Sequence, residues 1–237
     1  GESLRIPTIT AYGTASQTAA GSTISDAPPT FGSLLLTPYK QAGLVPVANE
    51  LIADAGFDLE STLVEAVGNS IGFQVNNLAT VGTGTDEPTG IVTAAGSGVA
   101  STATSLAADD LASLAYSLDG AARRLPGVGW MMNTSTLGAV RKLKDGAGNY
   151  VLDFSAGGAQ TLLGYPIFEN PAMSSVGSGV KSVIFGHLPS YKIASTGLDF
   201  AVSADAQFEK DVTVYRSTYR FDGNLTHASH VTYLPPS

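Results

Sequence analysis

One stretch of the chain, residues 58–80, carries an apolar stripe that a single long helix would gather on one side. The stripe repeats every three or four positions and consists of Leu59, Leu63, Val64, Val67, Ile71, Val75 and Leu78. Asp58 is suited to cap the start of this helix, and Glu60 lies in its first turn, where a negative charge is favourable. A helix of about 22 residues is about 33 Å long, which is long for a chain of this size.

The segment before this helix predicts a projecting hairpin. Residues 3–12 are rich in β-branched side chains and predict a strand, with Pro7 favouring an edge position. Residues 33–47 predict a second extended segment, and residues 13–32 between them are small or turn-forming, with Asp26 as their only charge. Such an arm cannot bury enough apolar surface by itself, so it is either mobile or docked on a partner. A disordered surface loop is the alternative.

The rest of the chain mixes short helices and strands, which together with the long helix indicates an α+β fold. Helices are expected at 107–119, with Leu111, Leu114, Ala115 and Leu118 on one face, and from a cap at Thr134 to Lys144. A short buried strand is expected at 129–132, and a turn at 145–149. Further strands are expected near 150–154, 165–168, 181–185, 191–194, 198–203 and 211–220.

Composition excludes several classes of function. Hydrophobic residues make up 43% of the chain, enough for a sizeable core, and the net charge is −8, which gives no overall attraction to nucleic acid or anionic lipid. The absence of Cys excludes disulfides, thiolate nucleophiles and cysteine-based metal sites. No apolar run approaches a membrane span, and the chain begins with neither Met nor a signal peptide, so we expect a fragment or a processed product.

Two glycine-containing motifs resemble catalytic or phosphate-binding patterns. Residues 68–72 match the hydrolase pattern G-x-S-x-G, with Ser70 followed in order by an acid (Asp199 or Asp205) and a histidine (His227 or His230). That chemistry needs a strand–turn–helix elbow, whereas these residues lie inside the helical stripe. Gly68 and Gly72 would weaken the helix by about 1 kcal/mol each, or let another backbone come close.

The second motif, residues 82–85 (GTGT), follows a helix rather than a strand and lacks the lysine of a phosphate loop. A structural loop is therefore the better interpretation. Histidines at 227 and 230 would face opposite sides of a strand, which spoils joint metal binding, and His187 stands alone in the sequence. Surface or hydrogen-bonded histidines are expected. No nucleophile, metal cluster or cofactor loop is convincing, and we expect no enzyme activity and no cofactor.

In order along the chain, these features resemble the major capsid proteins of tailed phages, which have the Hong Kong 97 type fold. The arm precedes a helix similar to the family's spine helix. The resemblance also includes the loop GTGTDEPTGI at 82–91, WMMN at 130–133, LKD..G.Y at 143–150, LGYPI at 163–167, IFGH at 184–187, Tyr191 and Arg220 in the last long strand.

The resemblance implies a structural protein whose copies form hexamers and pentamers of an icosahedral shell around double-stranded DNA, with an extended loop lying over a neighbouring copy. It implies a virion location, assembly in the cytoplasm of a host bacterium, and partners such as a scaffolding segment or protein, a protease and a portal, but no membrane. The implied division is an extended loop with an adjoining strand at 1–50, a peripheral domain with the spine helix at 51–92, an axial domain at 93–193, peripheral strands at 194–222 and a return to the axial domain at 223–237.

The chain departs from the family in two respects. The N-terminal arm and scaffolding segment that usually precede the extended loop are absent from this sequence. Some members also join a loop lysine to an asparagine with help from a glutamate, but residues 13–32 contain no lysine. Asp211 stands at the position of the asparagine and Thr218 at that of the glutamate, so we expect no covalent cross-linking.

Three alternatives stay open: an encapsulin-type compartment that encloses protein cargo, a serine hydrolase that uses Ser70, and a monomeric surface or adhesive domain. If the capsid interpretation holds, the functional residues lie at interfaces between copies. The expected interface residues in the arm and in the loop after the long helix are Thr14, Ser16, Thr18, Ser22, Asp26, Gly82, Gly84, Asp86 and Pro88, with Arg220 in the last strand.

Overall fold

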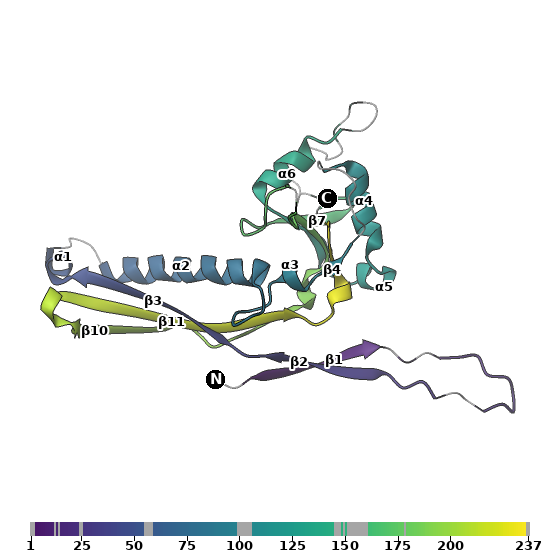
Figure 1. Cartoon of the computed structure of the whole chain (residues 1–237), viewed down its shortest axis with the longest axis horizontal. Helices are drawn as coiled ribbons and strands as arrows, with labels where there is room; N and C mark the ends of the chain where they lie inside the picture. The colour runs from purple at the N-terminus through teal and green to yellow at the C-terminus, as the bar shows by residue number, and fades with distance from the viewer. Residues whose placement is uncertain are drawn as a thin grey trace.

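The computed structural model shows three parts, a thin arm, an elongated half and a compact half (Figure 1). The residues that it describes are 3–11, 13, 15–23, 26–54, 59–98, 106–144, 148, 150, 161–177 and 179–235. Strands and helices mix along the chain, which confirms the α+β class. The arm is residues 3–36. The elongated half is built on a four-stranded sheet, and the compact half on a six-stranded sheet.

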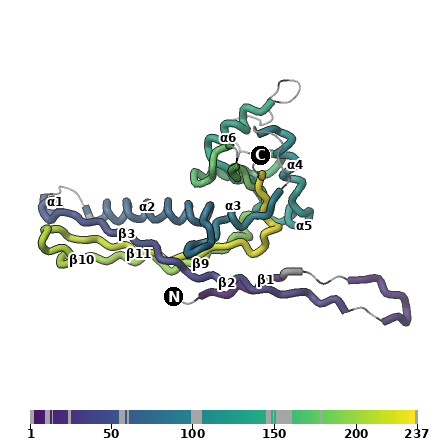
Figure 2. The backbone as a smooth tube through the Cα atoms, in the orientation of Figure 1, coloured from purple at the N-terminus to yellow at the C-terminus, as the bar shows by residue number. Residues whose placement is uncertain are grey.

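The arm is an antiparallel hairpin of β1 (Leu4–Ala11) and β2 (Thr30–Leu36). It forms a two-stranded sheet of its own and extends beyond the compact half (Figures 1 and 2). The predicted hairpin is therefore confirmed. The extended segment expected at 33–47 is two strands, because the chain leaves the arm at residues 37–38 and continues as β3 (Tyr39–Ala48) in the elongated half.

The sheet of the elongated half is built around one long strand, β11 (Val212–Leu225). Its first part pairs with β10 (Asp199–Gln207) and β3, and its last residues pair with β9 (Tyr191–Ser195), all antiparallel. The helix α2 (Leu59–Val81) lies along one face of this sheet, and α1 (Asn49–Asp54) lies at its far end (Figure 1). The predicted helix at 58–80 is confirmed. Asp58 and the side chain of Glu60 lie outside the described residues.

The compact half holds the six-stranded sheet, in which the pairs β12–β4 and β5–β7 are parallel. The strands in spatial order are β4 (Gly96–Ser97), β12 (Val231–Tyr233), β8 (Val183–His187), β5 (Val128–Met132), β7 (Tyr165–Glu169) and β6 (Thr161–Leu162). The helices of this half are α3 (Ile91–Ala94), α4 (Ala108–Ser117), α5 (Gly120–Arg123) and α6 (Thr134–Arg141). Among the described residues, 3-10 helices form at η1 (Leu188–Ser190), at η2 (Phe208–Lys210) between β10 and β11, and at η3 (Ala228–His230).

Several expected boundaries are corrected by the structure. The helix expected at 107–119 is α4 followed by the separate turn α5, whose cap is Asp119. Asn133, not Thr134, caps α6, because its side chain accepts a hydrogen bond from the Thr136 backbone, and that helix ends at Arg141 rather than Lys144. The turn at 145–149 and the strand at 150–154 lie mostly outside the described residues.

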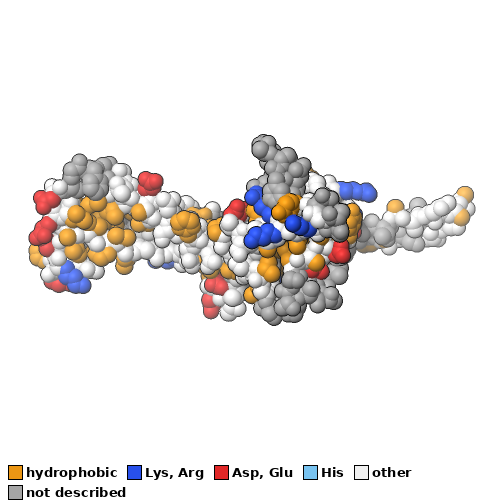
Figure 3. Space-filling model, turned by 90° about the horizontal axis from the view of Figure 1, so that it is seen from above, with side chains coloured by type: hydrophobic (Ala, Val, Ile, Leu, Met, Phe, Trp, Pro, Cys, Tyr) orange, Lys and Arg blue, Asp and Glu red, His pale blue; other side chains and the backbone are white. Residues whose placement is uncertain are grey.

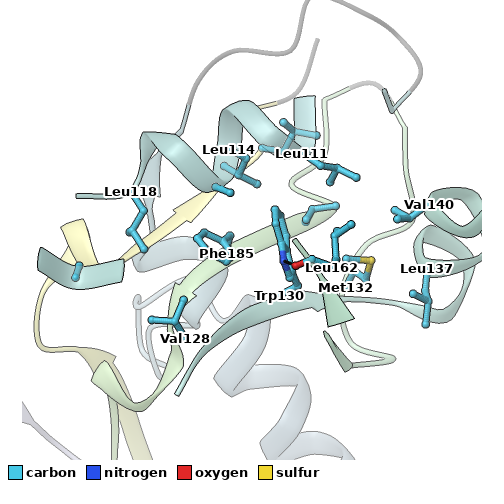
Figure 4. Close-up of a cluster of buried hydrophobic side chains, with 14 residues drawn as sticks. Leu111, Leu114, Leu118, Val128, Trp130, Met132, Leu137, Val140, Leu162 and Phe185 are labelled. Atoms are coloured by element: carbon cyan, nitrogen blue, oxygen red, sulfur yellow. Dashed lines mark hydrogen bonds between the residues drawn. The ribbon is translucent and has the colours of Figure 1, made fainter. Parts of the chain in front are cut away.

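The main core of the compact half forms around Trp130, which is fully buried (Figure 4). Its ring lies 4.4 Å from that of Phe185, and its indole N–H donates to the Leu162 carbonyl at 2.9 Å, so that its polar atom is satisfied. Leu111 and Leu114 from α4 cover this core on one side, and residues from α6 cover it on the other. The expected buried strand at 129–132 is thus confirmed.

Asn170 joins the long helix to the compact half. Its side-chain oxygen accepts from the Asn76 side chain at 2.8 Å, and its amide donates to Thr80 Oγ1 at 2.9 Å, both on α2. Its own backbone N–H donates to the Met132 carbonyl on β5 at 2.9 Å. Since Asn170 is buried, losing these partners would leave polar groups unpaired, and this residue therefore fixes the end of α2 against the sheet.

Candidate subunit interface

Alternation along the two strands of the arm gives it two apolar faces. Cross-strand pairs on one face are Leu4 with Leu36 and Ile6 with Leu34, and on the other face Ile9 with Phe31 and Arg5 with Leu35. Phe31 is 68% exposed and Leu35 51% exposed, so the described part of the chain leaves these side chains uncovered. A two-stranded hairpin is marginally stable alone in water, and an arm with two apolar faces therefore needs other surfaces to cover it.

The loop at the tip of the arm holds five of the expected interface residues. Ser16, Ser22 and Asp26 are exposed, and Thr18 is half-buried. The Ser22 N–H donates to the Ala19 carbonyl at 3.1 Å, which closes a turn at the tip. Thr14 lies outside the described residues. A role for these residues in an interface stays a prediction.

The arm is fixed to the elongated half at its root. The N–H of Thr37 donates to Asp222 Oδ2 at 2.6 Å, and the guanidinium of Arg220 donates to the Pro38 carbonyl at 3.5 Å. Asp222 and Arg220 both belong to β11. Arg220, expected at an interface, thus contacts the segment of its own chain that directly follows the arm, and its side chain is half-buried.

The glycine-rich loop at 82–90 follows α2 and is folded tightly on itself. A Cβ at Gly82 would lie 2.3 Å from the Pro88 carbonyl oxygen, so only glycine fits there. Gly84 and Asp86 have positive φ angles of 80° and 56°. Gly82 and Pro88 are buried inside the chain, whereas Gly84 and Asp86 are exposed. Of these four expected interface residues, the two at the loop tip are accessible at the surface of the chain, and their role in an interface stays a prediction.

The same loop is fixed internally and to the elongated half. Glu87 accepts hydrogen bonds from Thr83 N at 2.7 Å and Thr83 Oγ1 at 2.8 Å, and these bonds lower the pKa of the Glu87 carboxyl. Thr89 N donates to the Gly223 carbonyl at 3.1 Å, and Tyr191 Oη donates to the Thr89 carbonyl at 2.9 Å. Burial, and then the charge of Asp222, raise the pKa of Tyr191, so its hydroxyl stays a donor.

Two further apolar surfaces were missed by the sequence analysis. The far end of the elongated half exposes Leu51, Ile52 and Phe208, and Figure 3 shows hydrophobic side chains gathered at this end among charged ones. A groove of about 780 Å³ runs between β3 and α2, lined among others by Leu63, Val67 and Ile71. The stripe on α2 is thus only partly covered, with Phe73 beside it 72% exposed. Helical spacing predicts a stripe but does not show how closely the sheet approaches it.

The catalytic patterns do not form a catalytic site. Ser70 lies inside α2, where no strand–turn–helix elbow exists, and its neighbours Gly68 and Gly72 have no atom near the position of an added Cβ, so no backbone of the described chain packs closely there. The expectation of a strand at 227–230 is wrong, since residues 228–230 form the turn η3 and the rings of His227 and His230 lie 4.5 Å apart. The two rings therefore lie next to each other and not on opposite sides of a strand.

His187, which stands alone in the sequence, also belongs to this group, because its Nδ1 and that of His230 both contact Ser190 Oγ, at 2.7 and 2.9 Å. The expectation of hydrogen-bonded histidines is confirmed for these two. Among the described residues no group of three or more histidines and acids is arranged to hold a metal ion. No described helix is long and apolar enough to cross a membrane.

Comparisons with known proteins agree on one architecture. The phage capsid family matches residues 1–234 of the chain. The capsid of a native GTA particle is 21% identical with a TM-score of 0.88, and the match covers 99% of this chain and 85% of that one. A chain of Mycobacterium phage Adephagia is 19% identical with a TM-score of 0.71, covering 100% and 86%. These likenesses confirm the expected Hong Kong 97 type capsid fold. No curated protein matches the chain.

Proposed function

The chain belongs to the phage capsid family, and we propose that its copies assemble into hexamers and pentamers of a closed icosahedral shell around double-stranded DNA. It is a structural capsid protein of the virion rather than an enzyme.

The exposed apolar side chains of the arm are the main support for this proposal. Phe31 and Leu35 are each more than half exposed in the described chain, and the hairpin that holds them extends away from both halves. A second copy is the partner that every shell subunit meets, and an arm lying across a neighbour would bury the face that carries Phe31 and Leu35. Burial at about 25 cal/mol per Å² gives a driving force for association without any need for charge attraction.

The remaining interface residues fit contacts between copies at different places in a shell. We assign the elongated half to the peripheral domain and the compact half to the axial domain around a capsomer axis. In this assignment the exposed loop tip at Gly84 and Asp86 and the apolar end at Leu51 and Phe208 meet neighbouring copies. Head-to-tail contacts of this kind form a ring when the rotation from one copy to the next closes.

The chain has a net charge of −8, which repels the phosphates of DNA. This net negative charge supports DNA as a partner that the shell encloses and does not bind tightly. Loading of a genome also implies a portal. A scaffolding segment or protein, a protease, and assembly in the host cytoplasm complete the proposal. The nucleic acid content of purified particles tests it, because particles that hold a protein cargo and no DNA would indicate an encapsulin-type compartment instead.

Assembly is tested by negative-stain electron microscopy of the wild-type chain and of Leu35→Arg. We expect shells or ring-shaped capsomers for the wild type and only small species for Leu35→Arg, because the charge would have to be buried under a neighbour. Since Leu35 is exposed in the free chain, the variant should unfold within about 0.5 kcal/mol of the wild type. Ser174→Arg places the same charge on an exposed loop of the compact half and is the matched control.

Normal assembly of Leu35→Arg would contradict the role of the arm. A wild-type chain that stays monomeric at all concentrations would favour a surface domain. The hydrolase alternative has no support in the position of Ser70, and absence of labelling by a phosphonate probe would remove it.

A further inference from the structure

Three histidines lie where the chain crosses between its two halves. Besides the loop at 82–90 after α2, the chain crosses at two short segments. The first of these, residues 188–190, leads from β8 of the compact half to β9 of the elongated half, and His187 directly precedes it. The second, residues 226–230, leads from β11 back to β12 and contains His227 and His230. These two short segments are adjacent, since both the N–H and the hydroxyl of Thr226 donate to the Ser190 carbonyl at 3.0 Å. A change in the angle between the halves would involve these two segments together with the loop at 82–90.

Ser190 links the two crossings through its side chain as well. Its hydroxyl lies 2.7 Å from Nδ1 of His187 and 2.9 Å from Nδ1 of His230, and the residue is 4% exposed. When both rings are neutral, the serine hydroxyl can donate to one Nδ1 and accept from the N–H of the other.

The hydrogen bonds around Ser190 favour neutral imidazole rings at His187 and His230 and disfavour protonated ones. When both rings are protonated, both Nδ1 atoms are donors to Ser190 Oγ, and the serine hydroxyl hydrogen no longer has an acceptor among the two rings. Two charged rings would then lie 6.1 Å apart between centroids in a partly buried place. The backbones that carry the two rings are closely packed, because a Cβ at Gly186 would lie 2.3 Å from the His230 carbonyl oxygen.

Neighbouring charges act on the rings in both directions. Burial lowers the pKa of His187, the Pro126 hydrogen bond raises it, and the ammonium of Lys192 on β9 lowers it. Burial lowers the pKa of His230, the rings of His227 and His187 lower it further, and the carboxylate of Asp119 before α5 raises it. Arg123 on α5 stacks on the Tyr116 ring instead, 4.8 Å from its centroid.

We infer that His187, Ser190 and His230 form a proton-sensitive latch that holds the two halves of the chain together when both rings are neutral. Because the folded rings bind protons less readily than the unfolded ones, the latch contributes full stability above the unfolded pKa of about 6.5. That contribution is lost as the pH falls below this value toward the lowered pKa values. The latch belongs to the single chain and does not depend on assembly.

Amide hydrogen exchange of the free chain between pH 7.5 and 5.0 tests the inference. The Thr226 amide, corrected for intrinsic exchange, should open more readily as the pH falls, by up to about tenfold for each unit by which a folded pKa lies below the unfolded one. Amides of β5 in the core report global unfolding and should change less. The double variant His187→Asn with His230→Asn keeps donors and acceptors near the Nδ1 positions but cannot be protonated, so its Thr226 amide should lose this pH dependence.

His227→Asn is the matched control, because it removes a neighbouring ring and leaves the latch in place; it should keep most of the pH dependence. An equal pH response in the double variant, or none in the wild type, would overturn the inference. If the double variant does not fold, an NMR titration of the wild-type histidines decides. Titration of both His187 and His230 at or above pH 6.5 would overturn it, and titration of both below that value would support it.

Discussion

The N–H of Thr37 donates a 2.6 Å hydrogen bond to Oδ2 of Asp222, although the two residues are 185 positions apart. Asp222 is buried on β11, and its other oxygen accepts from the Gly223 N–H at 2.8 Å. Thr37 is the first residue after the arm. One carboxylate thus fixes the point from which the whole arm projects.

Asp222→Ala should therefore destabilise the chain and loosen the root of the arm. Two backbone donors lose their acceptor, and a buried unpaired donor costs about 1–3 kcal/mol. Urea unfolding measures the loss, and exchange of the Thr37 amide reports the loosening. Asp199→Ala on the neighbouring strand is the control, since that side chain is exposed and makes one long bond to Thr218; an equal loss in both variants would contradict the prediction.

Alanine at Gly68 or Gly72 should stabilise the free chain. Both glycines lie inside α2, and an added Cβ at either position meets no atom of the described chain within 4 Å. Each substitution should raise the free energy of unfolding by up to about 1 kcal/mol, because alanine favours the helix. Thermal unfolding measures this, and a loss of stability would refute it. A stabilised variant that assembles poorly would place a neighbouring copy's backbone at these glycines.

The loop after α2 should loosen in acid. Hydrogen bonds from Thr83 lower the pKa of Glu87, so their contribution is present above the usual glutamate value and is lost as the pH falls through the lowered one. Exchange of the Thr83 amide, followed from pH 6 to pH 3, should show this loss. Glu87→Gln should remove the pH dependence, whereas Glu65→Gln on the exposed face of α2 should leave it unchanged.

Gly223→Ala should be destabilising because Tyr191 fills the space. The added Cβ would lie 2.3 Å from the Tyr191 hydroxyl oxygen and 2.7 Å from Cζ, so the ring has to shift, at about 1–3 kcal/mol. Tyr191→Phe removes the closest atom but also the bond to the Thr89 carbonyl. In a double-mutant cycle the second substitution should cost less in the presence of the first; strict additivity would show that the ring does not restrict residue 223.

Assembled particles should contain no covalently joined subunits. Residues 13–32 provide no lysine, and Asp211 and Thr218 stand where the acceptor and helper of a cross-link are expected. Denaturing gels of purified particles should therefore show a single band at the mass of one chain. A ladder of multiples would disprove this.

The long helix, the arm and the buried strand at Trp130 could be predicted because each depends on local patterns. Spacing of three to four gave α2 nearly to the residue, and β-branched runs around small residues gave the hairpin. The chain's turn away from the arm at Thr37 was missed, because its cause is a hydrogen bond from a carboxylate far along the sequence.

The histidine group could not be predicted for the same reason. His187 and His230 are 43 positions apart and meet only because β8 and β12 pair in the compact half. The assumption of a strand at 227–230 also failed, since the chain turns there to change sheets. Exposed apolar residues on the arm follow from alternation, but which of them stay uncovered depends on the fold.

The length of β11 has a mechanical consequence. Its 14 residues run from the far end of the elongated half to the crossing at Thr226, and it is paired with β3, β10 or β9 along this course. Inter-strand hydrogen bonds in antiparallel pairs lie perpendicular to the strands, so a pull along β11 loads many of them in shear at once instead of peeling them one by one. In the wall of a shell under internal pressure, β11 would therefore carry tension along the elongated half of each subunit.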